Sequence, residues 1–294
     1  MFATLALACA AFYGAADFFG GLASKRAPTV VIAFLSQAAG LILLAVVLPI
    51  LPSASPVRAD ILWGAGSGFA GSVGVALLYR GLAIATMSIV APITAVCATV
   101  VPVLLAFALG ERPGTLAVAG IVLATLAIAL VSRGESMEGV LGETGQADAG
   151  LPRRSREAKS GVGLALASGV AVGLFFFCLA RTNSDAGLWP LIVGRLTSVP
   201  LFGAMVLTGR QSLRLPHSVT RTAVACGTLD MLANVFYLLA TRYGPLSLVA
   251  TLASLYPAST VLLARFTLGE RMTRSQMLGV VCALTAVVMI VGSS

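Results

Sequence analysis

The stretch Ser88-Ile89-Val90-Ala91 returns later in the chain as Ser247-Leu248-Val249-Ala250, at an offset of 159 residues. The stretch Leu109-Gly110-Glu111-Arg112 returns at the same offset as Leu268-Gly269-Glu270-Arg271. These two motifs lie about 20 residues apart in each copy, so they indicate a duplicated unit that is longer than either motif.

The start of the chain follows the same register. Leu5-Ala6-Leu7-Ala8 returns as Leu164-Ala165-Leu166-Ala167, and Gly14 aligns with Gly173. The duplicated unit is therefore nearly half of the chain, which is far longer than a solenoid repeat and predicts a duplicated bundle.

The composition predicts a membrane protein. Hydrophobic residues make up 58% of the chain and charged residues 10%, and the mean hydropathy is +0.99. A soluble domain carries roughly 25% charged residues, so lipid must be the solvent for most of this chain. Only helices and closed barrels satisfy their backbone groups in hydrocarbon. The apolar runs are continuous and long, about 18–23 residues, which predicts an all-α integral membrane protein.

Ten apolar runs are candidate transmembrane helices. They are Phe2–Leu22, Val30–Leu51, Ile61–Tyr79, Met87–Leu109, Leu116–Val131, Gly161–Ala180, Leu188–Leu207, Thr222–Thr241, Leu246–Leu268 and Met277–Val291. The third and fourth runs require a tight turn near Ala85-Thr86-Met87 because together they are too long for one crossing. The first run lacks a positive N-terminal region, so we expect a retained helix and no cleaved signal peptide.

Five spans per half predict two inverted-topology five-helix repeats, residues 1–132 and 161–294. An odd number of crossings makes the second half enter the membrane the opposite way round. Residues 133–160 between them are polar and contain no aromatic residue, which predicts a flexible linker. Small residues four apart in the third span, such as Gly64 and Gly68, predict a close helix contact.

The distribution of positive charge predicts the orientation. Alternate loops hold thirteen Lys and Arg residues against four. The richer set is Lys25, Arg26, Arg80, Arg133, Arg153, Arg154, Arg156, Lys159, Arg210, Arg214, Arg221, Arg271 and Arg274, and the other is Arg58, Arg112, Arg181 and Arg242. The positive-inside rule assigns the richer set to the cytoplasm of a cell membrane and both termini to the outside. The charges anchor loops, so we expect no nucleic-acid partner.

With these motifs in two copies and in register, the chain resembles the EamA family of the drug/metabolite transporter superfamily. Each half contains Ser-x-Val-Ala, an apolar helix, Leu-Gly-Glu-Arg and a further apolar helix. The resemblance implies a ten-helix secondary transporter of small organic solutes, often an exporter. It also implies a central cavity lined by the first, third and fourth helices of each half. Many family members place both termini in the cytoplasm, whereas the charges here predict the reverse.

Charged residues within spans are the best functional candidates because each costs at least about 2.5–3.5 kcal/mol at a helix centre. Arg80 and Arg265 lie near span ends and can reach the interface. Asp230 lies deep in the eighth span, with Asn234 and Tyr237 on the same helical face. Asp17 follows Tyr13 by one turn.

Each carboxylate is interpreted as a proton carrier or as a counter-charge for a cationic substrate. The structural alternative is an ion pair with Arg195, which could instead bind an anionic substrate. Tyr256, beside Pro257 in the ninth span, is a candidate cavity wall. The candidate substrate-binding residues are Tyr13, Asp17, Asp230, Asn234, Tyr237 and Tyr256.

The five cysteines stand singly in apolar runs, and the single histidine, His217, lies in a loop. We therefore expect no metal, no cofactor and no disulfide.

Three functions remain open. The first is an exporter of a metabolite, amino acid or drug-like solute that works by alternating access between the repeats. No nucleotide-binding motif is present, so its driving force would be an ion gradient, with protons as a candidate, or the gradient of the substrate. The second is a lipid-carrier translocase or an intramembrane enzyme using Asp17 and Asp230. The third is a non-transporting membrane scaffold. The oligomeric state is open.

Overall fold

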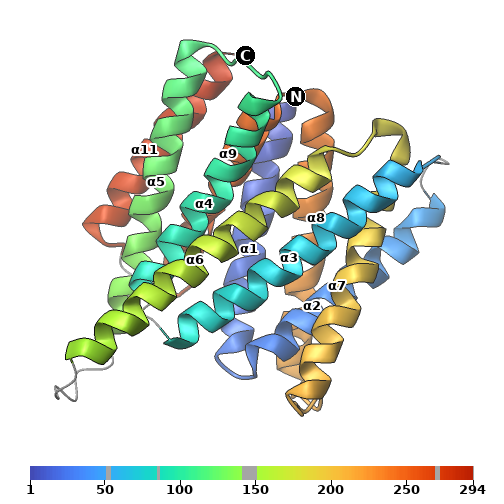
Figure 1. Cartoon of the computed structure of the whole chain (residues 1–294), viewed down its shortest axis with the longest axis vertical. Helices are drawn as coiled ribbons and strands as arrows, with labels where there is room; N and C mark the ends of the chain where they lie inside the picture. The colour runs from blue at the N-terminus through green and yellow to red at the C-terminus, as the bar shows by residue number, and fades with distance from the viewer. Residues whose placement is uncertain (51–53, 85–86, 141–150, 269–271, 294) are drawn as a thin grey trace.

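The computed structural model describes residues 1–50, 54–84, 87–140, 151–268 and 272–293. Of residues 79, 82–84, 87–89, 91–92, 133–140, 151–160 and 268, only the backbone is described. The described part of the chain is a bundle of helices without a β-strand (Figure 1).

In the described residues, the first half contains five long helices. They are α1 (Phe2–Ser24), α2 (Thr29–Val47), α3 (Arg58–Ile84), α4 (Met87–Ala108) and α5 (Thr115–Val140), with a 3-10 turn η1 (Leu48–Ile50) after α2. The second half contains six helices because its fourth span is broken. They are α6 (Leu151–Ala180), α7 (Trp189–Thr208), α8 (His217–Tyr243), α9 (Leu246–Ala253), α10 (Tyr256–Leu268) and α11 (Arg274–Gly292), with η2 (Ser184–Ala186) before α7.

The predicted membrane fold is confirmed. Nine helices of the described residues are long and apolar enough to cross a membrane, with α9 and α10 forming one span. The described apolar part of α4, Ile93–Ala108, occupies the remaining predicted span. The predicted turn at Ala85-Thr86-Met87 falls mostly on residues 85–86, which lie outside the described residues.

Within the predicted linker, residues 133–160, the described residues at both ends are helical. α5 continues to Val140 and α6 begins at Leu151, so only residues 141–150 lie between them, outside the described part. The extension of α6 has a reason in the sequence. Residues 153–159 are rich in Arg, Glu, Ala and Lys, which are good helix formers, and Pro152 stands in the first turn, where proline is tolerated. Polarity indicated that this segment leaves the membrane, but it did not decide whether the helix ends there.

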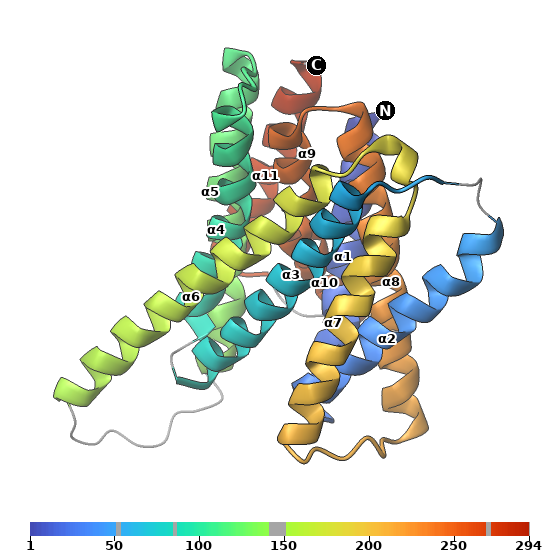
Figure 2. The same ribbon diagram turned by 45° about the vertical axis from the view of Figure 1, so that its right-hand side comes forward.

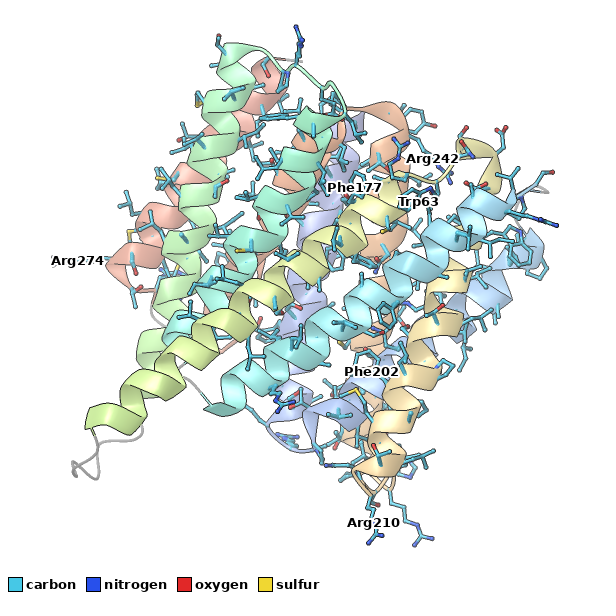
Figure 3. All side chains as sticks on the ribbon, in the orientation of Figure 1. Trp63, Phe177, Phe202, Arg210, Arg242 and Arg274 are labelled. Atoms are coloured by element: carbon cyan, nitrogen blue, oxygen red, sulfur yellow. The ribbon has the colours of Figure 1, made fainter. Side chains whose placement is uncertain are left out.

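The two halves are packed into each other. The first helix of each half packs along the third helix of the other half, α1 on α8 and α6 on α3, and α5 packs on α11. On α3 and α6, Trp63 and Phe177 meet edge to face with ring centroids 6.1 Å apart (Figure 3). The two termini lie together at one end of the bundle, while the start of α6 and the α7–α8 connection lie at the other (Figure 2). This arrangement agrees with ten crossings.

Glycine allows the closest crossings between the halves. A Cβ atom built on Gly68 of α3 would lie 2.8 Å from the Cα of Gly194 on α7, and one built on Gly64 would lie 2.7 Å from the carbonyl oxygen of Pro190. Gly227 of α8 aligns with Gly68 in the repeat register, and its Cβ would lie 2.6 Å from the Cα of Ser36 on α2. The predicted small-residue contact therefore exists in both halves.

We predict that Gly227→Ala lowers stability, because the added methyl group overlaps the backbone of α2. Overpacking of this kind costs about 1–3 kcal/mol. Gly21→Ala is the matched control, since a Cβ on Gly21 of α1 meets nothing within 4 Å. The thermal unfolding midpoint in detergent is the measurement. An unchanged midpoint for Gly227→Ala would show that the crossing can open at little cost.

Candidate functional site

The ninth span is broken near its middle. α9 ends at Ala253 and α10 begins at Tyr256, so Ser254 and Leu255 separate them. Pro257 has no N–H and cannot bond the carbonyl of Ala253 four residues earlier. Irregular backbone at membrane depth is tolerated only where it is buried in protein or lines a cavity, and broken helices are typical of transporter binding sites.

Helix α1 packs directly against this break. The hydroxyl of Thr260 on α10 donates to the carbonyl oxygen of Gly14 at 3.3 Å, and a Cβ on Gly14 would lie 2.9 Å from the carbonyl oxygen of Tyr256. The absence of a side chain at Gly14 therefore brings α1 into backbone contact with α10. As a result, Tyr13 lies beside the break.

An ion pair joins α7 to α8 close by. The Nη2 atom of Arg195 donates to Oδ2 of Asp230, while its Nη1 atom donates to Oε1 of Gln37 on α2. The side chain of Arg195 is 10% exposed and that of Asp230 is 28% exposed. The same oxygen of Gln37 accepts a hydrogen bond from the hydroxyl of Ser198 at 2.9 Å. Three helices from both halves thus share one charge pair.

Asn234 extends this network to α1. Its Nδ2 atom donates to the backbone oxygen of Asp230 at 2.7 Å and lies 3.3 Å from the carboxylate oxygen Oδ2. Its Oδ1 atom accepts a hydrogen bond from the hydroxyl group of Tyr13, with 2.9 Å between the two oxygen atoms. We call the chain of six side chains that results the polar network. Its members are Ser198, Gln37, Arg195, Asp230, Asn234 and Tyr13.

Aromatic rings surround the Tyr13 end of the polar network. The ring of Tyr13 lies 6.0 Å from that of Phe176 on α6 and 6.1 Å from that of Tyr256. Tyr237 is fully buried, and its hydroxyl donates to the backbone oxygen of Phe176 at 3.1 Å. Tyr237 therefore fixes α8 against α6, while Tyr13 connects the aromatic side chains to the charged ones.

Most of the predicted site residues come together, but Asp17 differs from Asp230. Tyr13, Asp230, Asn234 and Arg195 belong to the polar network, and Tyr237 and Tyr256 lie in the aromatic cluster at its end. Asp17 is exposed on α1. Arg195 was predicted to pair with Asp17 or Asp230, and in the structure it pairs with Asp230. The neighbour of Asp230 is thus an arginine instead of a second carboxylate.

Sequence analysis missed two members of the polar network, Gln37 and Ser198. Gln37 stands in the apolar second run directly after Ser36, the register equivalent of Arg195. An amide next to the position equivalent to an intramembrane arginine is a signal that could have identified it. Ser198 follows Arg195 by three residues on the same helical face.

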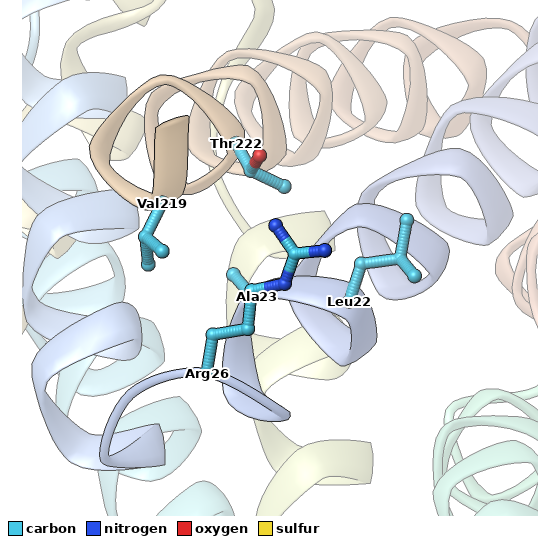
Figure 4. A pocket seen from close by; sticks show the side chains of 5 residues that line it. All are labelled: Leu22, Ala23, Arg26, Val219 and Thr222. Carbon is cyan, nitrogen blue, oxygen red and sulfur yellow. The ribbon is translucent and has the colours of Figure 1, made fainter. Parts of the chain in front are cut away.

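A separate hollow lies between the end of α1 and the start of α8 (Figure 4). Its walls are Leu22, Ala23, Val219 and Thr222, and the guanidinium of Arg26 points into it. The hydroxyl of Thr222 donates to the backbone oxygen of Ser218 at 2.9 Å. This hollow lies among loop-proximal residues and is distinct from the polar network.

The described residues contain no group of three or more His, Cys, Asp and Glu side chains able to hold a metal ion. The side chains of the polar network can form hydrogen bonds, pair charges and bind protons.

The EamA-like transporter family matches residues 1–133 and 159–292, and the chain belongs to this family. The predicted family assignment is confirmed, and with it the class of a membrane transporter of small solutes within the drug/metabolite transporter superfamily. No curated protein matches the chain.

Twenty-nine chains of solved structures are similar to it. One of them, described only as the crystal structure of a protein, has a TM-score of 0.73 and 16% sequence identity, with coverage of 98% of this chain and 95% of the other. At that identity the similarity concerns the fold alone.

We predict that breaking the ion pair is more costly than removing it. Arg195→Met or Asp230→Leu alone leaves a charge without its partner in the membrane interior, which costs about 3–5 kcal/mol in buried pairs. The double variant leaves no charge and should be closer to the native stability. The measurement is a double-mutant cycle on thermal unfolding in detergent, with the exposed Arg210→Met as control. Simple additivity of the two losses would contradict the pairing.

Proposed function

We propose that this chain is a secondary exporter of a small organic solute and is not an enzyme, and that it works by alternating access at a site between its two repeats. The polar network is the observation that supports this most directly. It includes Tyr13 and Gln37 from the first half and Arg195, Asp230 and Asn234 from the second. A site shared by both halves changes when the halves move relative to each other.

The broken ninth span supports the same location for substrate binding. Tyr13 lies between the break and Asn234, so a solute beside Tyr13 would contact both the aromatic and the polar side chains. Small-molecule sites commonly combine apolar and aromatic walls with a few placed polar groups. We infer that Tyr13, Asn234, Asp230 and Tyr256 contact the solute and that Tyr237 positions α8.

We also propose that the chain lies in a cell membrane with both termini outside. Arg210 and Arg242 lie at opposite ends of the bundle (Figure 3), and they belong to the rich and the poor set of loop charges. The positive-inside rule then places the end with Arg210 in the cytoplasm and both termini outside a cell membrane.

Comparison of extracellular metabolites tests the transport proposal. Cells that produce the native chain should accumulate at least one compound outside that is absent with Asp230→Asn and with an empty control. Asp185→Asn, an exposed carboxylate in η2, is the matched control and should behave as the native chain does. Protein levels in the membrane are matched by immunoblot. Identical profiles for native chain and empty control would contradict export.

We propose protons as the coupling ion, with Asp230 as the carrier. The carboxylate of Asp230 is bonded by Arg195 and Asn234, so proton uptake would weaken the ion pair between α7 and α8. Asp17 is the alternative carrier.

The compound identified by export is then used in proteoliposomes with an imposed pH gradient. The gradient should drive accumulation by the native chain, and Asp230→Asn should lose this dependence while Asp17→Asn keeps it. The reverse result would assign the proton to Asp17. Accumulation that is independent of the gradient for the native chain would contradict proton coupling.

A further inference from the structure

The repeated motif Leu109-Gly110-Glu111-Arg112 forms the end of α4. The N–H of Glu111 bonds the carbonyl of Ala106 at 3.1 Å, and the N–H of Gly110 bonds that of Phe107 at 3.0 Å. This pattern is a Schellman motif, in which the residue after the helix takes the left-handed conformation that glycine adopts without strain. Gly110 has φ of +95°. The glycine ends the helix and fixes the direction of Glu111.

Glu111 in turn binds the start of the other repeated motif, from the opposite half. Its Oε1 atom accepts the N–H of Leu246 at 2.7 Å, and its Oε2 atom accepts the N–H of Ser247 at 3.0 Å. These are the first two residues of α9. The carboxylate satisfies two N–H groups that have no partner within the helix, and it lies at the positive end of the helix dipole.

Helix α9 is a short buried segment that packs against helices of both halves. It has only eight residues, all of them buried, and the break at Ser254 and Leu255 separates it from α10. Within the described structure, the hydroxyls of Ser247 and Ser254 are buried and have no hydrogen-bond partner. Unsatisfied buried hydroxyls are unfavourable, so this position of α9 carries a cost that the bonds from Glu111 offset.

From these contacts we infer that Glu111 is a positioning residue for transport, a latch that holds α9 in place at the end of the bundle where the termini lie. Release of the two bonds lets α9 move about the break at Ser254, which opens the path from that end to Tyr13. This inference rests on the proposed function. The repeat register gives Glu270 and Ser88 as the equivalent pair, and both side chains lie outside the described part of the chain.

A thiol probe at Ser247 tests the latch without any substrate. Ser247→Cys replaces a buried hydroxyl that makes no hydrogen bond, so the substitution costs little. The five native cysteines are first replaced by alanine, and vesicles are labelled with a membrane-impermeant maleimide from the side of the termini. Glu111→Gln should raise the labelling rate about two- to thirtyfold, the range expected for loss of a charge at a helix N-terminus. Arg112→Gln, the exposed neighbour, should not.

A second probe separates the latch from a purely structural role. Ala223→Cys is fully buried in a separate small core where α1, α2 and α8 meet. Because this core lies toward the end of the bundle opposite the termini, Ala223→Cys is labelled from that side, in vesicles of the reverse orientation. Its labelling rate should stay unchanged in Glu111→Gln, whereas general loosening of the protein would raise it as it raises that of Ser247→Cys. Equal increases at both probes, or no increase at Ser247→Cys, would overturn the inference.

Glu111→Asp provides the measurement if Glu111→Gln does not fold. The shorter aspartate keeps the charge but reaches less far, so an intermediate labelling rate is expected and an unchanged one would again overturn the latch. Because labelling needs no solute, the latch can fail while export is observed. Export can equally fail while the latch is observed.

Discussion

A guanidinium and a carboxylate in the membrane interior must neutralise each other, and in this chain that requirement determines where three helices meet. Arg195 reaches Asp230 and Gln37 because α2 packs against both α7 and α8 and so holds the two helices near each other. The close crossings at Gly68 and Gly227 make this geometry accessible, because the helices touch through their backbones there. The polar network and the glycine crossings are therefore parts of one arrangement, in which small residues bring the charged ones within bonding distance.

The two repeated motifs contact each other across the two halves of the chain. In the first half, Gly110 ends α4 and directs Glu111 away from it, and in the second half Leu246 and Ser247 offer the N–H groups that Glu111 accepts. In this copy, the end of one motif therefore binds the start of the other motif across the two halves. Each of them alone would be too short to indicate anything.

Much of the fold could be predicted from the sequence, because long apolar runs and a repeat register are properties of the chain itself. The ion pair of Arg195 with Asp230 was one of the predicted options, since few partners exist for a charge in a span. The break at Ser254 could not be predicted, because the residues around it are as apolar as the rest of the span and Pro257 is compatible with a continuous, kinked helix. The helical ends at Val140 and Leu151 were missed because polarity predicts solvent and does not predict coil.

The polar network is not duplicated, although the scaffold that holds it is. In the repeat register its six members align with small or apolar residues. Asp230 aligns with Gly71, Arg195 with Ser36, Asn234 with Val75, Tyr13 with Val172, Gln37 with Leu196 and Ser198 with Ala39. With two identical halves, the inward-open and outward-open forms would be related by a two-fold rotation about an axis in the membrane plane and would have equal free energy. The six side chains of the polar network make the two forms differ in free energy, so they determine which form the resting protein adopts. Exchanging these side chains between the halves would therefore change the resting form.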